Sequence, residues 1–149
     1  FRENIALDRA LSREELMRIA RLAHLEDLVS RLPGQLEAEV YEGGVTLSAG
    51  QRQLLAIARA MSYDPKVLIL DEATANIDSE TEHLIQQALE RLFQGRTTLV
   101  IAHRLSTIRQ ADRILVLHNG QIVEHGTQED LLSRRDFYYR LHQLQFASP

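Results

Sequence analysis

LSAGQRQLLAIARAMSYDPKVLILDE, residues 47–72, holds a helix start and a strand within one short stretch. Ser48 stands three residues before Gln51, which is the spacing of a capping box, where each side chain accepts a hydrogen bond from the other residue's backbone N–H. A helix is therefore predicted to begin at Ala49. The apolar, branched run 67–70 is typical of a strand in a parallel sheet. A helix that leads into such a strand predicts an α/β fold.

The predicted helix start also has the features of a phosphate site. First-turn N–H groups have no acceptor within the helix, and the helix dipole adds to their attraction for anions. Ala49 and Gly50 are small, so a ligand can approach the backbone closely. The same pattern also fits a capped helix that merely packs in the core. Its apolar face would then be formed by Leu54, Leu55, Ile57 and Ala58.

Composition bounds the class of protein. The 149 residues, 44% of them hydrophobic, have the length and apolar content of one globular domain. A formal net charge of −4 argues against a nucleic-acid partner, which requires clustered basic residues. Without cysteine there is neither a disulfide framework nor a cysteine metal site. The chain lacks an apolar run of about 20 residues and starts without Met, so it is interpreted as a soluble piece of a longer protein.

Helical signals dominate residues 1–65. Ser12 and Glu15 form a second capping box, a further helix is predicted to end at Pro33-Gly34, and no strand signal occurs in this half. Beyond it, the runs 67–70 and 97–102 are predicted to be strands buried on both faces of a parallel sheet.

The remaining elements follow from caps and turns. The amphipathic helix 79–93 has Asp78 placed to cap it and Gly95 placed to end it. Residues 113–126 are predicted to form a hairpin around Asn119-Gly120. One or two helices opened by Thr127 are expected to complete the chain.

Acidic residues follow the first predicted strand. Asp71 and Glu72 lie at its carboxyl end, where open α/β sheets bind ligands. One carboxylate there suits Mg²⁺, and the second could orient or deprotonate an attacking water. His103 follows the next strand, which would place an imidazole at the same edge. A solvated acidic turn and an ordinary histidine remain the alternatives.

Together these motifs resemble those of ATP-binding-cassette (ABC) ATPases. LSAGQ is similar to their signature motif, VLILDE to their Walker B strand, the residues 75–78 to their D-loop, and His103 to their switch histidine. Glu3-Asn4-Ile5, Glu42 and the wording ATANIDSETE look most like bacterial multidrug or lipid exporters. The resemblance implies a partial P-loop NTPase-like α/β core. Residues 1–64 would be the helical signature subdomain with its X-loop, and residues 65–149 the C-terminal portion of the catalytic core.

One family motif is missing. The family holds the nucleotide phosphates in a G-x-x-x-x-G-K-[ST] loop, and the printed sequence contains none; its one lysine is Lys66. The resemblance implies that the signature turn meets the γ-phosphate of a nucleotide held by a second nucleotide-binding domain. The chain's own lysine loop is expected upstream of Phe1, and the isolated chain is expected to be inactive.

The resemblance implies ATP and Mg²⁺ as cofactors and assigns a role to each site residue. Asp71 would organise Mg²⁺, Glu72 would act as catalytic base or water orienter, and His103 would contact the γ-phosphate. Asp78 would link the two sites across the dimer interface. The opposite nucleotide would be completed by Ser48, Ala49, Gly50 and Gln51. Ala49 stands where the family more often has glycine, and a methyl group is tolerable there.

The implied partners are a second nucleotide-binding domain, in a homo- or heterodimer, and the coupling helices of a transmembrane domain near Glu42. The chain would then work at the cytoplasmic face of the cell membrane. Two alternatives remain open: the C-terminal lobe of a chromosome-maintenance ATPase, and a truncated module without catalysis. The first would need an adjoining coiled coil, and no heptads lead into Phe1.

Overall fold

The computed structural model describes residues 1–40, 47–71, 77–102, 108–109 and 111–146, and the chain forms two compact units, Phe1–Val100 and Ile101–Pro149. The elements of the first unit are α1 (Arg2–Ala6), α2 (Arg13–Leu22), α3 (Glu26–Arg31), the 3-10 turn η1 (Gln35–Glu37), α4 (Ala49–Tyr63), β1 (Val67–Asp71), α5 (Ser79–Phe93) and β2 (Thr97–Ile101), which ends at the unit boundary. Those of the second are β3 (Ile114–His118), β4 (Gln121–Gly126), α7 (Gln128–Arg134) and α8 (Phe137–Phe146). The predicted α/β class is confirmed, while the predicted boundary after residue 64 stays a prediction.

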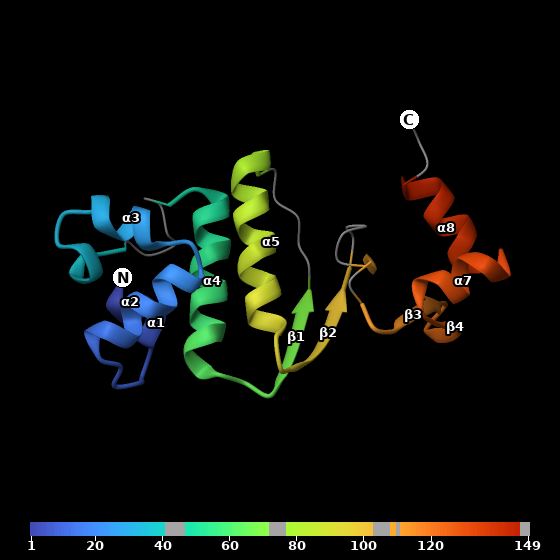
Figure 1. Ribbon diagram of the computed structural model, residues 1–149, viewed down its shortest axis with the longest axis horizontal. Coiled ribbons are helices and arrows are strands. Elements are labelled where there is room, and N and C mark those ends of the chain that lie inside the picture. The colour runs from blue at the N-terminus through green and yellow to red at the C-terminus, as the bar shows by residue number, and fades with distance from the viewer. Residues whose placement is uncertain (41–46, 72–76, 103–107, 110, 147–149) are drawn as a thin grey trace. The chain divides into compact units, whose positions relative to one another are not determined.

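Helix α4 is the centre of the first unit. It packs against α1 and α2 on one side and against α5 on the other (Figure 1). The four apolar residues predicted to face the core are all buried: Leu54, Leu55, Ile57 and Ala58. They join a single hydrophobic cluster with the apolar faces of α2, α3 and α5. The helix period of the sequence therefore sets which face of α4 is buried.

The predicted helix boundaries agree with the structure where local caps define them. Ser12 Oγ accepts a hydrogen bond from Glu15 N at 3.2 Å, and Glu15 Oε2 accepts one from Ser12 N at 2.8 Å, so the capping box starts α2 as expected. Helix α3 ends at Arg31, two residues before Pro33. Gly95, just after α5, has a φ of 71°, the left-handed conformation that favours glycine at a helix end.

Strands β1 and β2 form a two-stranded sheet, and both arrows point the same way in Figure 1. Arg96, just before β2, holds the segment that leads into β1. Its guanidinium donates a hydrogen bond to Pro65 O at 3.1 Å and pairs with the Asp64 carboxylate at 2.6 Å. Thr97 N donates to Lys66 O at 3.1 Å beside it. The parallel sheet portion is therefore confirmed.

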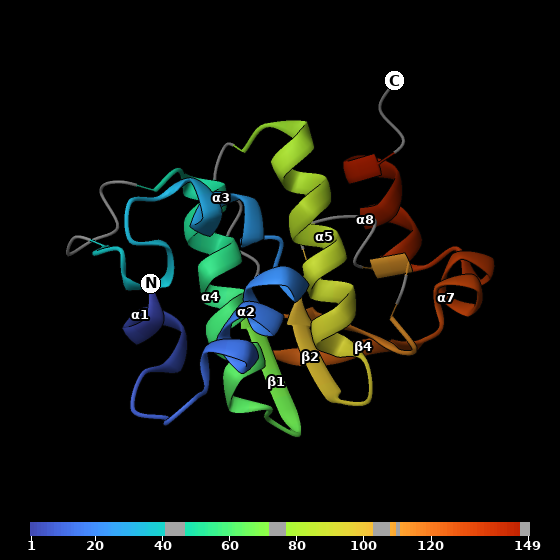
Figure 2. The ribbon, with the colours of Figure 1, turned by 60° about the vertical axis from the view of Figure 1, so that its left-hand side comes forward.

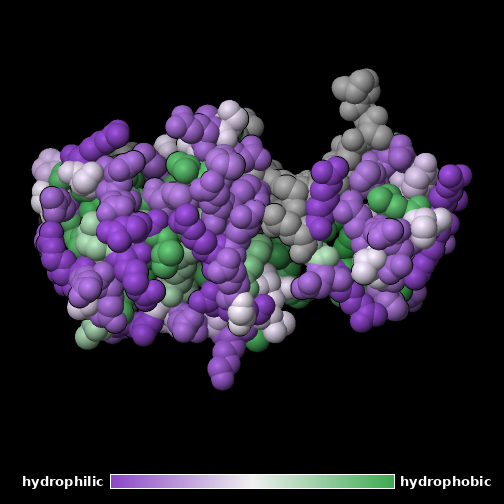
Figure 3. Space-filling view, in the orientation of Figure 1, coloured by the Kyte–Doolittle hydropathy of each residue, from purple (hydrophilic) through white to green (hydrophobic). Residues whose placement is uncertain are grey.

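The expectation that these strands are buried on both faces is wrong for this chain. Leu68 is 7% exposed, but its neighbours Val67 and Ile69 are 61% and 74% exposed, and Leu99 of β2 is 54% exposed. Successive strand residues point to opposite faces, and within the described residues only the face carrying Leu68 and Leu70 packs against the helical cluster. Figure 3 shows hydrophobic surface in the region of these strands.

The second unit is a hairpin with two helices. β3 and β4 are antiparallel, and the turn residues Asn119 and Gly120 have φ values of 49° and 76°, as the predicted hairpin turn requires. Thr127 caps α7 as predicted, and α8 follows, so the tail forms two helices. Seen from a second side, α7 and α8 are again separate helices joined by a short turn (Figure 2).

A buried carboxylate ties the hairpin to α8. Glu124 is 8% exposed and accepts a hydrogen bond from the backbone N of Tyr138 at 2.6 Å, in the first turn of α8. Val116, opposite Glu124 in the ladder, packs with Leu131 and Tyr138 in the small core of this unit. Among the helices that the structure describes, none has both the length and the apolarity needed to cross a membrane.

The one-sided sheet makes a stability prediction for the chain on its own. Leu68→Ala should lower the free energy of unfolding by about 2–5 kcal/mol, because it opens a cavity in the cluster. Ile69→Thr should change it by less than about 0.5 kcal/mol, because that side chain is exposed and threonine keeps the β-branch. Urea unfolding followed by circular dichroism measures both. Equal losses at the two positions would contradict the one-sided sheet.

Candidate functional site

The signature turn, residues 47–51, is a closed capping box. Ser48 Oγ accepts a hydrogen bond from Gln51 N at 3.2 Å, and Gln51 Oε1 accepts one from Ser48 N at 2.9 Å. Arg52 reaches back to donate to Leu47 O at 2.8 Å. The predicted helix start at Ala49 is therefore confirmed, and Ser48 is exposed. The first-turn N–H groups of Ala49 and Gly50 have no acceptor within the helix.

Gly50 differs from its neighbours in the turn because it is buried. The space that a Cβ would take at this position is filled by Thr81, in the first turn of α5, and by Ile77, just before that helix. The absence of a side chain at Gly50 thus lets two helices of the same chain approach each other. The sequence predicts a close approach at this position by a ligand; no sequence motif pointed to Thr81.

Asp78 caps α5. Its Oδ1 accepts a hydrogen bond from Thr81 N at 2.9 Å, as predicted for the N-cap of this helix. The hydrogen bond from this backbone N–H, followed by one from the Thr81 hydroxyl, lowers the pKa of the Asp78 carboxyl. The carboxylate is solvent-exposed, so it is ionised and accessible at neutral pH while it holds the helix start.

The structure brings two of the predicted site residues to neighbouring helix starts in the first unit. In Figure 1 the N-terminal ends of α4 and α5 lie at the top of the view, and β1 points toward that end but stops well below them. The two helix starts carry Ser48 and Asp78, and Asp71 is the last residue of β1. The helix starts favour anions, whereas the carboxylate at the end of β1 favours a cation.

Several predicted residues lie outside the described residues. They are Glu42, Glu72, Ala75, Asn76 and His103. The grouping of Asp71 with Glu72 and His103 therefore stays a prediction. Asp71 is exposed at the end of β1, and an oxygen ligand of this kind fits the chemistry of Mg²⁺. Within the described ranges no three His, Cys, Asp or Glu side chains gather as metal ligands, so Asp71 could supply only one ligand of such a site.

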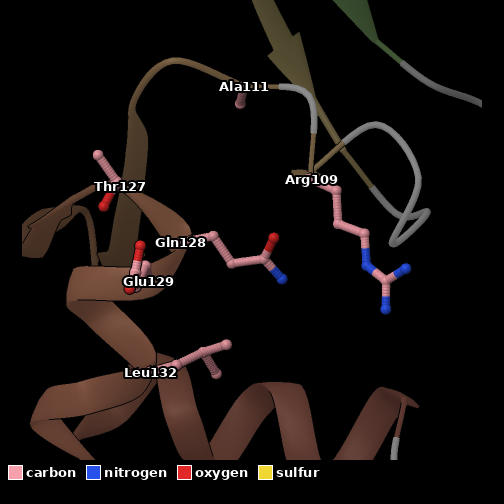
Figure 4. A pocket seen from close by; sticks show the side chains of 6 residues that line it. All are labelled: Arg109, Ala111, Thr127, Gln128, Glu129 and Leu132. Carbon is pink, nitrogen blue, oxygen red and sulfur yellow. The ribbon is translucent and has the colours of Figure 1, made fainter.

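A hollow lies in the second unit. Its described lining residues are Arg109, Ala111, Thr127, Gln128, Glu129 and Leu132. In Figure 4 the side chains of Arg109 and Gln128 extend into open space beside the start of α7. The hollow is open to solvent, and none of its described lining residues is a predicted site residue.

Comparison with known proteins identifies the family. The profile of the family described as "ABC transporter" matches residues 1–75. The chain belongs to the ABC transporter family. The family resemblance seen in the four motifs is thus confirmed, and with it the P-loop NTPase fold class.

Similar proteins include exporters and flippases of much greater length. An ATP-dependent lipid A-core flippase of Syntrophus aciditrophicus (strain SB) is 53% identical over 97% of this chain and 24% of the flippase. The probable multidrug resistance ABC transporter ATP-binding/permease protein YheH of Bacillus subtilis (strain 168) is 52% identical over 95% of the chain and 21% of YheH. The structure of a bacterial Atm1-family ABC exporter with ATP bound is 41% identical over 98% of the chain and 26% of the exporter, with a TM-score of 0.84. The chain thus spans about a quarter of the length of these relatives.

Replacing Ser48 tests the capping box of the signature turn. Ser48→Ala should lower the free energy of unfolding of the isolated chain by about 1 kcal/mol, whereas Ser48→Asp, which keeps a good cap, should preserve it. Urea unfolding provides the measurement. Ser12→Ala, in the equivalent box of α2, is the matched control and should cost a similar amount. A Ser48→Ala variant as stable as the parent chain would show that the box contributes nothing.

Replacing Asp78 tests the origin of its lowered pKa. The folded-state pKa lies below the unfolded value of about 3.9, so the carboxylate stabilises the fold above that pH and its contribution is lost as the pH falls through the folded pKa. Asp78→Asn should keep the cap and much of the stability at pH 7. Its free energy of unfolding should then fall less than that of the parent chain as the pH is lowered. Urea unfolding at pH 7 and at several values below pH 5 separates the two effects. If the free energy of unfolding fell equally with pH in parent and variant, the lowered pKa of Asp78 would not contribute to stability.

Proposed function

We propose that the chain is the C-terminal portion of a nucleotide-binding domain that powers export of a substrate by an ABC transporter. The observation that carries this proposal is the contact between two capped helix starts, those of the signature turn and of Asp78, in a chain of this family. The named flippase, YheH and the Atm1-family exporter support export rather than chromosome maintenance.

The proposed mechanism assigns one task to each motif. Asp71 contributes an oxygen ligand toward Mg²⁺, and Glu72 orients the attacking water and accepts its proton. His103 donates a hydrogen bond toward the γ-phosphate. Ser48 and the first-turn amides of α4 face the γ-phosphate of a nucleotide on a second domain, where the positive end of the helix stabilises negative charge. ATP would supply the phosphoryl group, and Mg²⁺, when bound, would offset its negative charge.

Two features of the chain indicate what the rest of the domain would contribute: the absent lysine loop and an exposed apolar sheet face. The printed sequence contains no lysine loop for the phosphates. The apolar sheet face of Val67, Ile69 and Leu99 is uncovered in the described part of the chain. We assign both deficits to the same remainder of the domain, which would supply the lysine loop and cover this face. Residues 1–64 then act as the signature subdomain and residues 65–149 as part of the catalytic core.

The proposed partners are a second nucleotide-binding domain and the coupling helices of a transmembrane domain, at the cytoplasmic face of the membrane. Glu42, near the end of the signature subdomain, is assigned to the contact with the coupling helices. Asp78 is assigned to the interface between the two nucleotide-binding domains. Its carboxylate is exposed and ionised, which suits a polar contact across an interface.

A chimeric transporter tests the function. Residues 1–149 replace the aligned segment of the Syntrophus aciditrophicus flippase, to which they are 53% identical. The chimera should hydrolyse ATP with Mg²⁺, whereas the isolated chain should show negligible hydrolysis and weak nucleotide binding by calorimetry.

Point substitutions in the chimera test the individual roles. Glu72→Gln should stop turnover and retain ATP binding, because the amide keeps the size but cannot accept a proton. Ser48→Asp should be less active than Ser48→Ala, because it sets a negative charge against the phosphate.

Two outcomes would contradict the proposal. Steady hydrolysis by the isolated chain would show that the lysine loop is not needed. An assembled, membrane-inserted chimera without ATPase activity would favour a truncated module that binds partners but does not take part in catalysis.

A further inference from the structure

The starts of α4 and α5 meet at one tight contact. A Cβ placed on Gly50 would lie 2.1 Å from Cγ2 of Thr81, and 3.3 Å from both Cβ of Thr81 and Cγ2 of Ile77. Carbon atoms that are not bonded approach each other no closer than about 3.5 Å at their optimal separation. A side chain at Gly50 would therefore force the two helix starts apart.

Thr81 cannot easily yield to such a side chain. Its backbone N–H donates a hydrogen bond to Asp78 Oδ1 at 2.9 Å, so the residue is held to the α5 cap. The methyl carbon Cγ2 of Thr81 is the side-chain atom that faces Gly50. Ile77, on the other side of the contact, packs against the hydrophobic cluster of the first unit.

We propose that Thr81 is a positioning residue for ATP hydrolysis: its methyl group, packed against Gly50, fixes the signature turn relative to the Asp78 cap. The inference rests on the proposed function, because only then do both motifs face nucleotide. The signature turn and the Asp78 cap belong to different helices. The contact at Gly50 joins the starts of those two helices directly.

The contact explains why a small misplacement would matter. Groups that stabilise a transferring phosphoryl group must be held within a fraction of an ångström, and a displacement of about 1 Å can cost roughly a hundredfold in rate. A methyl group on Gly50 meets Thr81 of its own chain, so it would push the start of α4 away from α5. The first-turn amides of Ala49 and Gly50 would move with it.

The methyl and hydroxyl of Thr81 can be separated by substitution. Thr81→Ser removes Cγ2 and keeps the hydroxyl, whereas Thr81→Val keeps Cγ2 and replaces the hydroxyl with a second methyl group. Gly50→Ala should lower the urea midpoint of the isolated chain when residue 81 is Thr or Val. In the Thr81→Ser background the same substitution should lower the midpoint far less or should raise it, because the 2.1 Å clash is gone, only the two 3.3 Å contacts remain, and alanine is the better helix former and restricts the unfolded chain.

The role in hydrolysis is tested in the flippase chimera with the same set of variants. Gly50→Ala should lower kcat by roughly ten- to a hundredfold with little change in KM for ATP, because the nucleotide is held mainly by the lysine loop. Gly50→Ala/Thr81→Ser should recover most of that loss, and Gly50→Ala/Thr81→Val should not. Recovery of both kcat and the urea midpoint by serine, and not by valine, is the expected result.

The outcomes separate this inference from the proposed function. An active parent chimera in which Gly50→Ala is not rescued by Thr81→Ser overturns the role of Thr81 alone, since Gly50 would then be needed for direct contact with the nucleotide. Rescue of the midpoint without rescue of kcat has the same meaning. A folded but inactive parent chimera overturns the proposed function, and the role of Thr81 with it.

Discussion

The close approach of α4 and α5 at Gly50 is the constraint on which the first unit depends. Without a Cβ at Gly50, the start of α4 lies directly against Thr81 and Ile77. The two helices then pack along their apolar faces, and the opposite side of α4 is free to receive α1 and α2. Since one helix serves both sides of the core, any change in its position reaches the whole hydrophobic cluster.

Two side-chain caps fix the starts of these helices. Ser48 and Asp78 each accept a first-turn N–H of their own helix. The first-turn amides of α4, which have no acceptor within the helix, are thereby held in place by a closed ring of hydrogen bonds. Such an arrangement is what electrostatic stabilisation of a developing charge requires, because donors that are already oriented need no reorganisation during the reaction.

The sequence predicts those features that depend on a few neighbouring residues. The caps at Ser12, Ser48, Asp78 and Thr127 are confirmed because each needs only a side chain and a backbone N–H within one helical turn. The Asn119-Gly120 hairpin is confirmed for the same reason, since its turn conformation is set by the two residues in it.

Features that depend on distant residues were not predictable in this way. The burial of β1 was predicted on both faces, but composition indicates only that Val67 and Ile69 are suited to burial, and the structure shows that nothing in the described residues covers them. The contact of Gly50 with Thr81 joins residues on two helices, and no local pattern encodes it. For the candidate site, the local frame of Ser48 and Asp78 could be predicted, whereas its tertiary link through Thr81 required the structure.

The helices and the sheet of the first unit differ in how completely they are buried. The helical cluster closes on itself, with Leu16, Leu25 and Leu36 fully buried and both helix starts capped. The sheet does not, because its apolar residues Val67, Ile69, Leu99 and Ile101 are exposed. A fold in which the helices are self-sufficient and the sheet is not would place the signature turn correctly by itself, yet leave Asp71 beside a sheet that lacks its second layer. On the proposed function, the signature turn can therefore form before the catalytic edge is complete, and the remainder of the domain would supply the cover for the sheet and the lysine loop in one step.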